Sequence, residues 1–161
     1  DVASEGYQTA GNWVGILFGL QSIGSVVWAL VIPKFRNIKT AYVVSLLIGA
    51  VGFASVFFIH DQYLLILSFL LIGVAWAAML ALPFTILTNA LSGSHMGTYL
   101  GLFNGTICVP QIVAASLGGL VLKMFTTEGN IPPEVNMLVL AGVFLIIGAC
   151  CVGVIKEGKG K

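Results

Sequence analysis

The residues of this sequence that could do chemistry are a few uncharged polar side chains set in long apolar stretches. In one stretch Asn104, Cys108, Gln111 and Ala115 follow each other at intervals of four, three and four residues, which places them on one face of a helix. An amide among apolar groups is costly unless it is hydrogen-bonded. The stripe is therefore a candidate surface for contacting a substrate. Hydrogen bonding that only holds helices together explains it as well, and both interpretations stay open.

Catalytic and metal-binding chemistry has no support in the sequence. The apolar stretches contain no pair of ionisable residues, which argues against a proton relay or an ion site of the usual kind. His60 and His95 stand alone between the stretches, without the partners that a metal site needs. A glycine-rich phosphate loop, a Cys/His cluster and a nucleophile paired with a base are all missing. We therefore expect no enzyme activity, no metal and no cofactor.

The composition indicates that membrane-spanning elements must position these side chains. Hydrophobic residues make up 58% of the 161 positions and charged residues only 8%, and the mean hydropathy is +1.05. A soluble domain carries about 25% charged residues, because water has to wet its surface. The formal net charge of +1 gives no electrostatic reason to expect nucleic acid as a partner. The partner that the composition implies is the lipid bilayer.

Five apolar runs are long enough to cross the hydrocarbon core, which takes about 20 residues of helix. None of them alternates as the strands of a membrane barrel do. The sequence therefore predicts an all-α integral membrane protein with five transmembrane helices. The predicted spans cover residues 13–32, 41–59, 63–88, 98–124 and 137–155.

Basic residues between the spans predict how the chain is oriented. Lys34, Arg36 and Lys39 lie between the first two spans, and three more lysines follow the fifth span, on the same side of the membrane. The opposite side has only Lys123, at its border. Cytoplasmic loops carry the excess of Lys and Arg. We expect a multi-pass protein of the cell (inner) membrane with an outside N-terminus and a cytoplasmic C-terminus. An outside N-terminus fits a fragment of a longer chain.

Two tracks of glycine predict close packing of helices. Small residues at every fourth position let two helix backbones approach closely in lipid. The first and fourth predicted helices each carry three glycines at this spacing, the first glycine of each track just before the apolar run, and these helices also belong to the polar class. The second and fifth spans are almost purely apolar. We expect the two tracks to pack tightly or slide against other helices; they consist of Gly11, Gly15 and Gly19, and of Gly97, Gly101 and Gly105.

A family resemblance is carried by three stretches of the third and fourth spans. They are GVAWAAMLALPFTILTNAL (73–91), GTYLGLFN (97–104) and VPQIVA (109–114). They resemble sugar transporters of the major facilitator superfamily, above all the sucrose/maltose–proton symporters and the glycoside–pentoside–hexuronide transporters. The basic loop PKFRNIK (33–39) is similar to the weaker second copy of the superfamily's cytoplasmic Gly-x-x-x-Asp-Arg-x-Gly-Arg-Arg loop, without its acidic residue.

The resemblance implies a particular place for these spans in a larger fold. The family has twelve helices in two halves, and the five spans would be its eighth to twelfth helices. Residues 1–161 would then be a fragment of the C-terminal bundle, and the missing N-terminal half of the same chain would be a partner. Helices eight, ten and eleven of the family face the cavity or the other half, while nine and twelve face lipid. This division agrees with the polar content of the five spans.

The sequence and the resemblance together predict a secondary transporter of a sugar, either a di- or oligosaccharide or a glycoside. Transport would proceed by alternating access around a midplane site, coupled to a proton or a sodium ion in the full-length protein. Trp76 would stack on a sugar ring, and Gln21, Asn104 and Gln111 would hydrogen-bond its hydroxyl groups. The basic loop is assigned to orientation and to conformational locking, although plain solvated charges explain it too.

Two other classes of protein remain as alternatives. The first is a small non-transporting subunit or assembly factor of a membrane complex, complete at five spans. An upstream coding sequence with about seven further spans would exclude it. The second is a channel, which would need pore-lining rings of charged side chains or exposed carbonyl groups. No motif in the sequence supports a channel.

Overall fold

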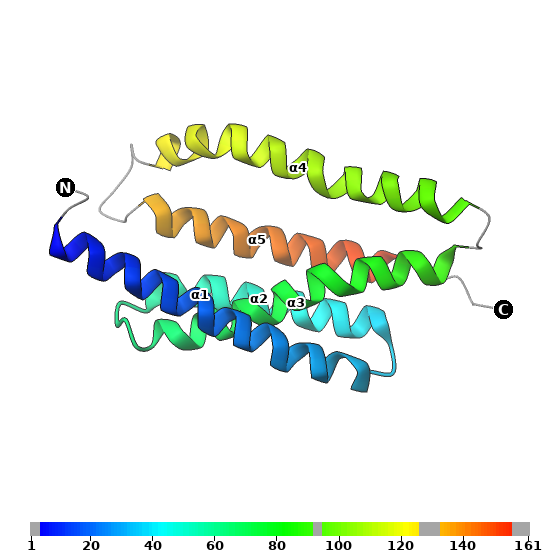
Figure 1. The fold of residues 1–161 in the computed structure, drawn as a ribbon, viewed down its shortest axis with the longest axis horizontal. Helices are drawn as coiled ribbons and strands as arrows, with labels where there is room; N and C mark the ends of the chain where they lie inside the picture. Colours follow the sequence, from blue (N-terminus) through cyan, green and yellow to red (C-terminus); the bar gives the residue numbers. More distant parts are fainter. Residues whose placement is uncertain (1–3, 92–94, 126–132, 156–161) are drawn as a thin grey trace.

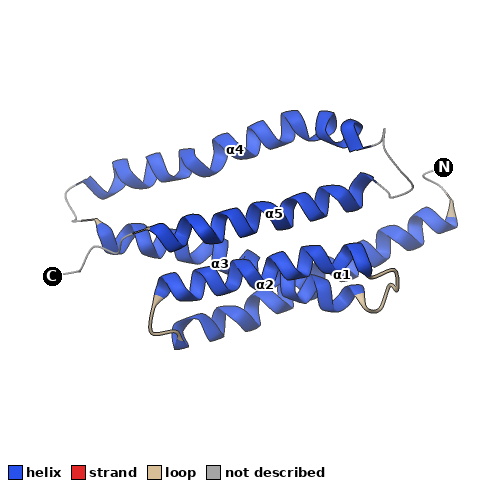
Figure 2. Cartoon of the chain, turned by 180° about the vertical axis from the view of Figure 1, so that it is seen from behind, coloured by secondary structure: helices blue, strands red, loops and turns tan. Residues whose placement is uncertain are grey.

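The computed structural model describes residues 4–91, 95–125 and 133–155, and these residues form long helices (Figures 1 and 2). No strand occurs among them. Five helices are long and apolar enough to cross a membrane, which confirms the predicted all-α membrane fold. In chain order the elements are α1 (Glu5–Val31), the 3-10 turn η1 (Ile32–Lys34), α2 (Ile38–Phe58), α3 (Leu65–Ala90), α4 (Met96–Phe125) and α5 (Pro133–Val154).

Polar caps rather than hydropathy set where α1 and α2 begin. The Ser4 hydroxyl accepts a hydrogen bond from the Tyr7 amide at 3.3 Å, and α1 starts at Glu5 instead of residue 13. The Asn37 side chain accepts from two backbone amides in the first turn of α2. Asp61 accepts from the Tyr63 amide at 2.8 Å, just before α3. Such caps satisfy amides that have no partner within the helix, so α1 and α2 begin before the apolar runs, whereas α3 begins at Leu65, two residues inside its predicted run.

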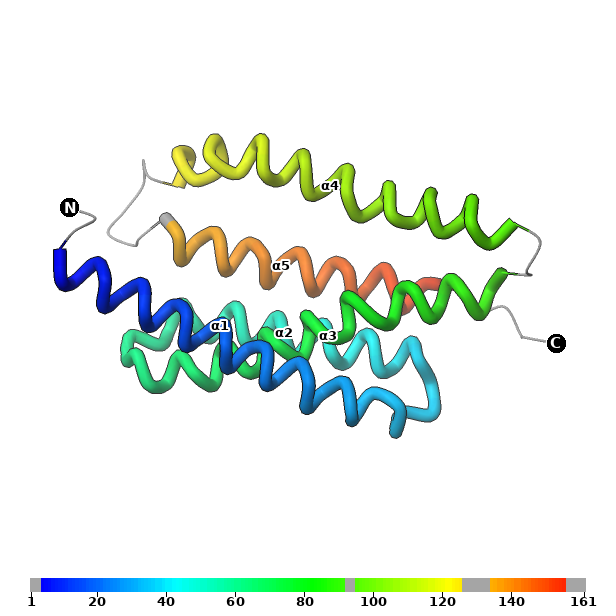
Figure 3. The backbone as a smooth tube through the Cα atoms, viewed as in Figure 1, coloured from blue at the N-terminus to red at the C-terminus, as the bar shows by residue number. Residues whose placement is uncertain are grey.

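The helices alternate in direction between two ends of the molecule (Figures 1 and 3). The starts of α1, α3 and α5 lie at one end, together with the ends of α2 and α4. At the other end, the Lys39 ammonium group at the start of α2 donates a hydrogen bond to the carbonyl oxygen of Ile155, just after α5. The basic loop and the end of α5 therefore lie at the same end of the molecule, as the sequence predicts.

The second helix holds the packed part of the chain together. It packs on α3 and on α5, and α1 also packs on α3. α4 lies alongside α5, is set apart from the other helices in Figure 1, and has no buried residue. Polar content therefore does not predict which helices pack within this chain, because α2 is among the least polar of the five.

Small side chains make the packing around α2 possible. Ala75 and Ala78 of α3 are completely buried, as are Ser45 of α2 and Ser68 of α3. A Cβ at Gly52 would lie only 2.9 Å from the Ser68 carbonyl oxygen. Close backbone approach through small residues is how helices gain van der Waals contact in lipid, where no hydrophobic force joins them.

Candidate functional site

The first and third helices touch backbone to backbone at one crossing. A Cβ at Gly24 of α1 would lie 2.7 Å from the Leu70 carbonyl oxygen, and one at Gly73 of α3 would collide with the Gln21 carbonyl oxygen. The Ser25 hydroxyl donates to the Gly73 carbonyl oxygen at 2.8 Å, which joins the two helices across the crossing. Only glycine allows the two backbones to come this close. The crossing therefore leaves little freedom in the distance between α1 and α3.

Two of the four predicted substrate-binding residues flank this crossing. Gln21 is half-buried on α1, and its carbonyl oxygen faces Gly73. Trp76 lies three positions after Gly73 on α3, so the two residues are neighbours on that helix surface. The Trp76 side chain is 51% exposed. Its indole N–H has no hydrogen-bond partner among the residues that the structure describes, so the ring stands at the surface of the packed helices.

The other two predicted residues lie on α4, away from the crossing. Asn104 and Gln111 are both exposed, and neither side chain makes a hydrogen bond within the described part of the chain. Two hydroxyl groups within the same span are satisfied locally, since Thr106 donates to the Phe103 carbonyl oxygen at 2.7 Å and Ser116 to that of Ile112 at 2.8 Å. The amides are thus the side chains of this polar stripe that still need partners.

The two predicted glycine tracks contact nothing in the described structure. At each of their six positions a Cβ would meet no atom within 4 Å. Their role in helix packing therefore stays a prediction, and the helices that they would pack against lie outside the described residues. The glycines that do bring helices together here are different ones, namely Gly24, Gly49, Gly52, Gly73 and Gly142.

Sequence reasoning missed a set of hydrogen bonds that ties α1, α2 and α3 together. The Trp28 indole N–H donates to the Ser45 hydroxyl at 2.8 Å, and Ser45 donates to the Ala41 carbonyl oxygen at 2.6 Å. The hydroxyl groups of Ser55 and Ser68 lie 2.8 Å apart and share a hydrogen bond. A serine in an apolar helix is a visible signal, but the sequence does not tell which residue it bonds.

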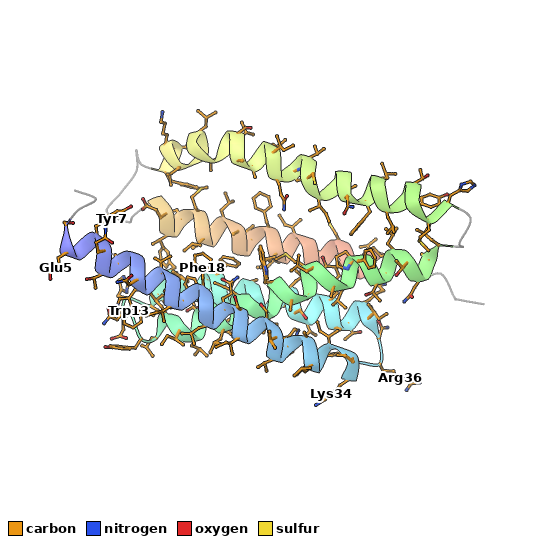
Figure 4. All side chains as sticks on the ribbon, in the orientation of Figure 1. Glu5, Tyr7, Trp13, Phe18, Lys34 and Arg36 are labelled. Atoms are coloured by element: carbon orange, nitrogen blue, oxygen red, sulfur yellow. The ribbon has the colours of Figure 1, made fainter. Side chains whose placement is uncertain are left out.

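Most of the described charges are separated between the two ends of the molecule (Figure 4), with Lys123 in the last turn of α4 as the exception. Lys34 and Arg36 lie at one end and Glu5 at the other, next to Tyr7 and Trp13. The remaining described acids, Asp61 and Glu134, precede α3 and begin α5, at the same end as Glu5. Over the residues that the structure describes, no group of His, Cys, Asp and Glu is placed to hold a metal ion.

Comparison with known proteins identifies one family. The model for the Major Facilitator Superfamily matches residues 4–160, which include all five helices. Searches of the curated proteins and of the solved structures found no match.

Proposed function

The chain belongs to the major facilitator superfamily, a family of secondary transporters, and from this premise we propose that it forms helices eight to twelve of a sugar transporter. The two bundles of the complete twelve-helix protein would rock around a midplane site. The preceding part of the same chain would supply the remaining helices, which are the seventh helix and the six helices of the missing N-terminal half. The sugar would be a di- or oligosaccharide or a glycoside.

The observation that carries this proposal is the pair of unsatisfied amides on α4. Asn104 and Gln111 lie seven positions apart in a span, so they share a face two turns long. In lipid an unpaired amide is costly, and such groups face a bundle or a watered cavity. Because no described residue bonds them, a hydrogen-bonding partner has to come from outside these helices. A transported substrate in a watered cavity is such a partner.

The chemistry of a sugar suits the four residues. A carboxamide both donates and accepts hydrogen bonds, as each sugar hydroxyl does, so Gln21, Asn104 and Gln111 are matched to several hydroxyl groups. Trp76 offers an exposed aromatic face that can pack on the apolar face of a pyranose ring. No carboxylate lies within a predicted span, so a coupling proton or sodium ion would be bound by residues of the N-terminal half.

We further propose that the end carrying Lys34, Arg36 and Lys39 is cytoplasmic, in a cell inner membrane. This assignment rests on the preference of cytoplasmic loops for Lys and Arg. The start of α1 would then be outside. Loop 33–39 would help to lock the conformation in which the cytoplasmic side is closed.

Sugar uptake by variants of the full-length protein tests the four assignments. Gln111→Ala and Trp76→Ala should each raise the KM for uptake about fivefold, since one neutral hydrogen bond and one stacked aromatic ring each contribute about 1 kcal/mol. Both variants should remain in the membrane at the level of the parent.

Matched controls on the same helices separate binding from general damage. Ser116→Ala removes a hydroxyl that bonds only within α4, and Phe84→Ala removes another exposed aromatic ring from α3. Both should leave the KM unchanged. Unchanged kinetics in Gln111→Ala and Trp76→Ala would sink the assignment of the site, and equal losses in the controls would do the same.

A further inference from the structure

A cleft of about 330 Å³ opens between the start of α2 and the end of α5. Its polar part consists of Asn37, Lys39 and Thr40, and its apolar part of Val43, Val44 and Gly153. It lies at the basic end of the molecule, on α2 and α5, whereas the crossing and the unpaired amides lie on α1, α3 and α4. None of the residues proposed for sugar binding lines it.

The polar and apolar parts of this cleft are arranged along the axis of a membrane-spanning helix. Asn37 precedes α2 and Lys39 is its second residue, so the polar part lies where the span begins. Val43 and Val44 come about one turn later, about 6 Å further into the span at 1.5 Å per residue. Gly153 of α5 adds no side chain on the opposite wall. A ligand that fills the cleft therefore needs a polar head and an apolar continuation.

The charge at this end is positive. Lys39 lines the cleft, and Lys34 and Arg36 lie in the preceding turn and loop. The described acids, Glu5, Asp61 and Glu134, lie at the opposite end of the helices. The head of the ligand should therefore be an anion.

The hydrogen bonding of Lys39 and Asn37 shows which donors are available to that anion. The Lys39 ammonium group donates to the Ile155 carbonyl oxygen, which holds it across the cleft toward α5 and leaves two of its three protons. The Asn37 side-chain oxygen accepts from the amides of Lys39 and Thr40, so the first amides of α2 are already used. The side-chain donors are thus the Lys39 ammonium group, the Thr40 hydroxyl and the NH2 group of Asn37.

We propose that this cleft binds an anionic phospholipid from the adjacent leaflet. The lipid phosphate lies against Lys39 and Thr40, and the first carbons of an acyl chain lie along Val43, Val44 and Gly153. A basic side chain near an anionic membrane surface raises the affinity for an anionic lipid by about tenfold at most. The apolar wall supplies the remaining selectivity for a lipid over a free phosphate ion. This site is independent of the sugar site.

Native mass spectrometry of the full-length protein tests the proposal. The purified protein is incubated with phosphatidylglycerol or with phosphatidylcholine of the same chain length, and the lipid retained after detergent exchange is counted. The parent should retain at least fivefold more phosphatidylglycerol. Lys39→Gln should lower that retention about fivefold, and Lys39→Arg should preserve most of it. Lys34→Gln removes a charge that does not line the cleft and should have little effect.

Two further measurements distinguish the cleft from diffuse attraction and from an ion site. Gly153→Leu fills the apolar wall without changing any charge and should also lower phosphatidylglycerol retention. Glycerol phosphate added in excess should not displace the lipid. Equal losses in Lys34→Gln and Lys39→Gln would overturn the proposal in favour of diffuse charge. Displacement by glycerol phosphate, or normal retention in Gly153→Leu, would overturn the lipid as occupant.

Discussion

The backbone crossing of α1 and α3 yields the most sharply defined prediction. In Gly73→Ala the new methyl group would collide with the Gln21 carbonyl oxygen and lie 3.0 Å from the Ser25 amide nitrogen. Both neighbours are backbone atoms, so the helices themselves must separate. Overpacking of this kind costs about 2 kcal/mol. The separation also breaks the 2.8 Å bond from Ser25 to the Gly73 carbonyl oxygen, which adds about 0.6 kcal/mol.

The matched control for this change is Gly148→Ala in α5. There a Cβ would have its nearest neighbour, a methyl group of Leu46, at an ordinary 3.8 Å. Both variants gain the same helix propensity from the methyl group, so the difference between them isolates the collision. We expect Gly73→Ala to be less stable than Gly148→Ala by about 2.5 kcal/mol, the sum of the two costs above.

Unfolding by sodium dodecyl sulfate in mixed micelles, followed by circular dichroism, measures this difference in the full-length protein. A double-mutant cycle adds a second requirement. Ser25→Ala should cost about 0.6 kcal/mol in the parent and almost nothing in Gly73→Ala, where the hydrogen bond is already broken. Equal stability of Gly73→Ala and Gly148→Ala would refute the close approach of α1 and α3. Additive effects of Gly73→Ala and Ser25→Ala would refute the role of the hydrogen bond.

Two other predictions concern the hydrogen bond between α1 and α2 and the orientation of the chain in the membrane. Trp28→Phe removes the bond to Ser45 and should cost about 0.6 kcal/mol in the same unfolding assay. Trp13→Phe, which keeps the ring that packs edge-on against Tyr63, should cost less, and the reverse order would contradict the assignment. A cysteine in place of Asp61 should react with an impermeant maleimide on intact cells, whereas one in place of Arg36 should react only after the membrane is opened. The opposite labelling pattern would contradict the proposed orientation.

The number and type of the helices follow from the sequence because hydropathy and length are enough to define a membrane span. Their ends do not, because they depend on single capping side chains. Ser4 extends α1 to Glu5, well before the apolar run that begins at residue 13, and Asn37 starts α2 at Ile38. A capping signal is short and common, so it is harder to recognise in the sequence than the long apolar run beside it.

The sequence predicts where the helices lie in the chain better than it predicts which helices contact each other. Spacing shows where two backbones are able to approach, but not which helices meet there. The regular track of Gly11, Gly15 and Gly19 meets nothing in the described structure, whereas Gly24, which is outside the track, lies against Leu70. The pairing depends on how each helix is rotated and tilted, and small residues at one interface do not specify that alone.

The sequence predicts which residues form the candidate site, but it does not predict where these residues lie relative to one another. An amide and an indole stand out in apolar helices, which is why the sequence indicates Gln21 and Trp76, and both lie beside the crossing of α1 and α3. Asn104 and Gln111 are indicated for the same reason, and they lie on α4, whose contacts within this chain are few. A shared site for all four residues therefore stays a proposal about the complete transporter.

The most direct test of that proposal is sugar counterflow in vesicles reconstituted with the full-length protein. The vesicles are loaded with an unlabelled disaccharide or glycoside and diluted into a trace of the same sugar carrying a label. Alternating access predicts a transient accumulation of label above its equilibrium level, which should be weakened in Gln111→Ala and Trp76→Ala. No accumulation with any sugar of a panel of disaccharides and glycosides, in vesicles that contain the folded protein, would contradict sugar transport by this chain.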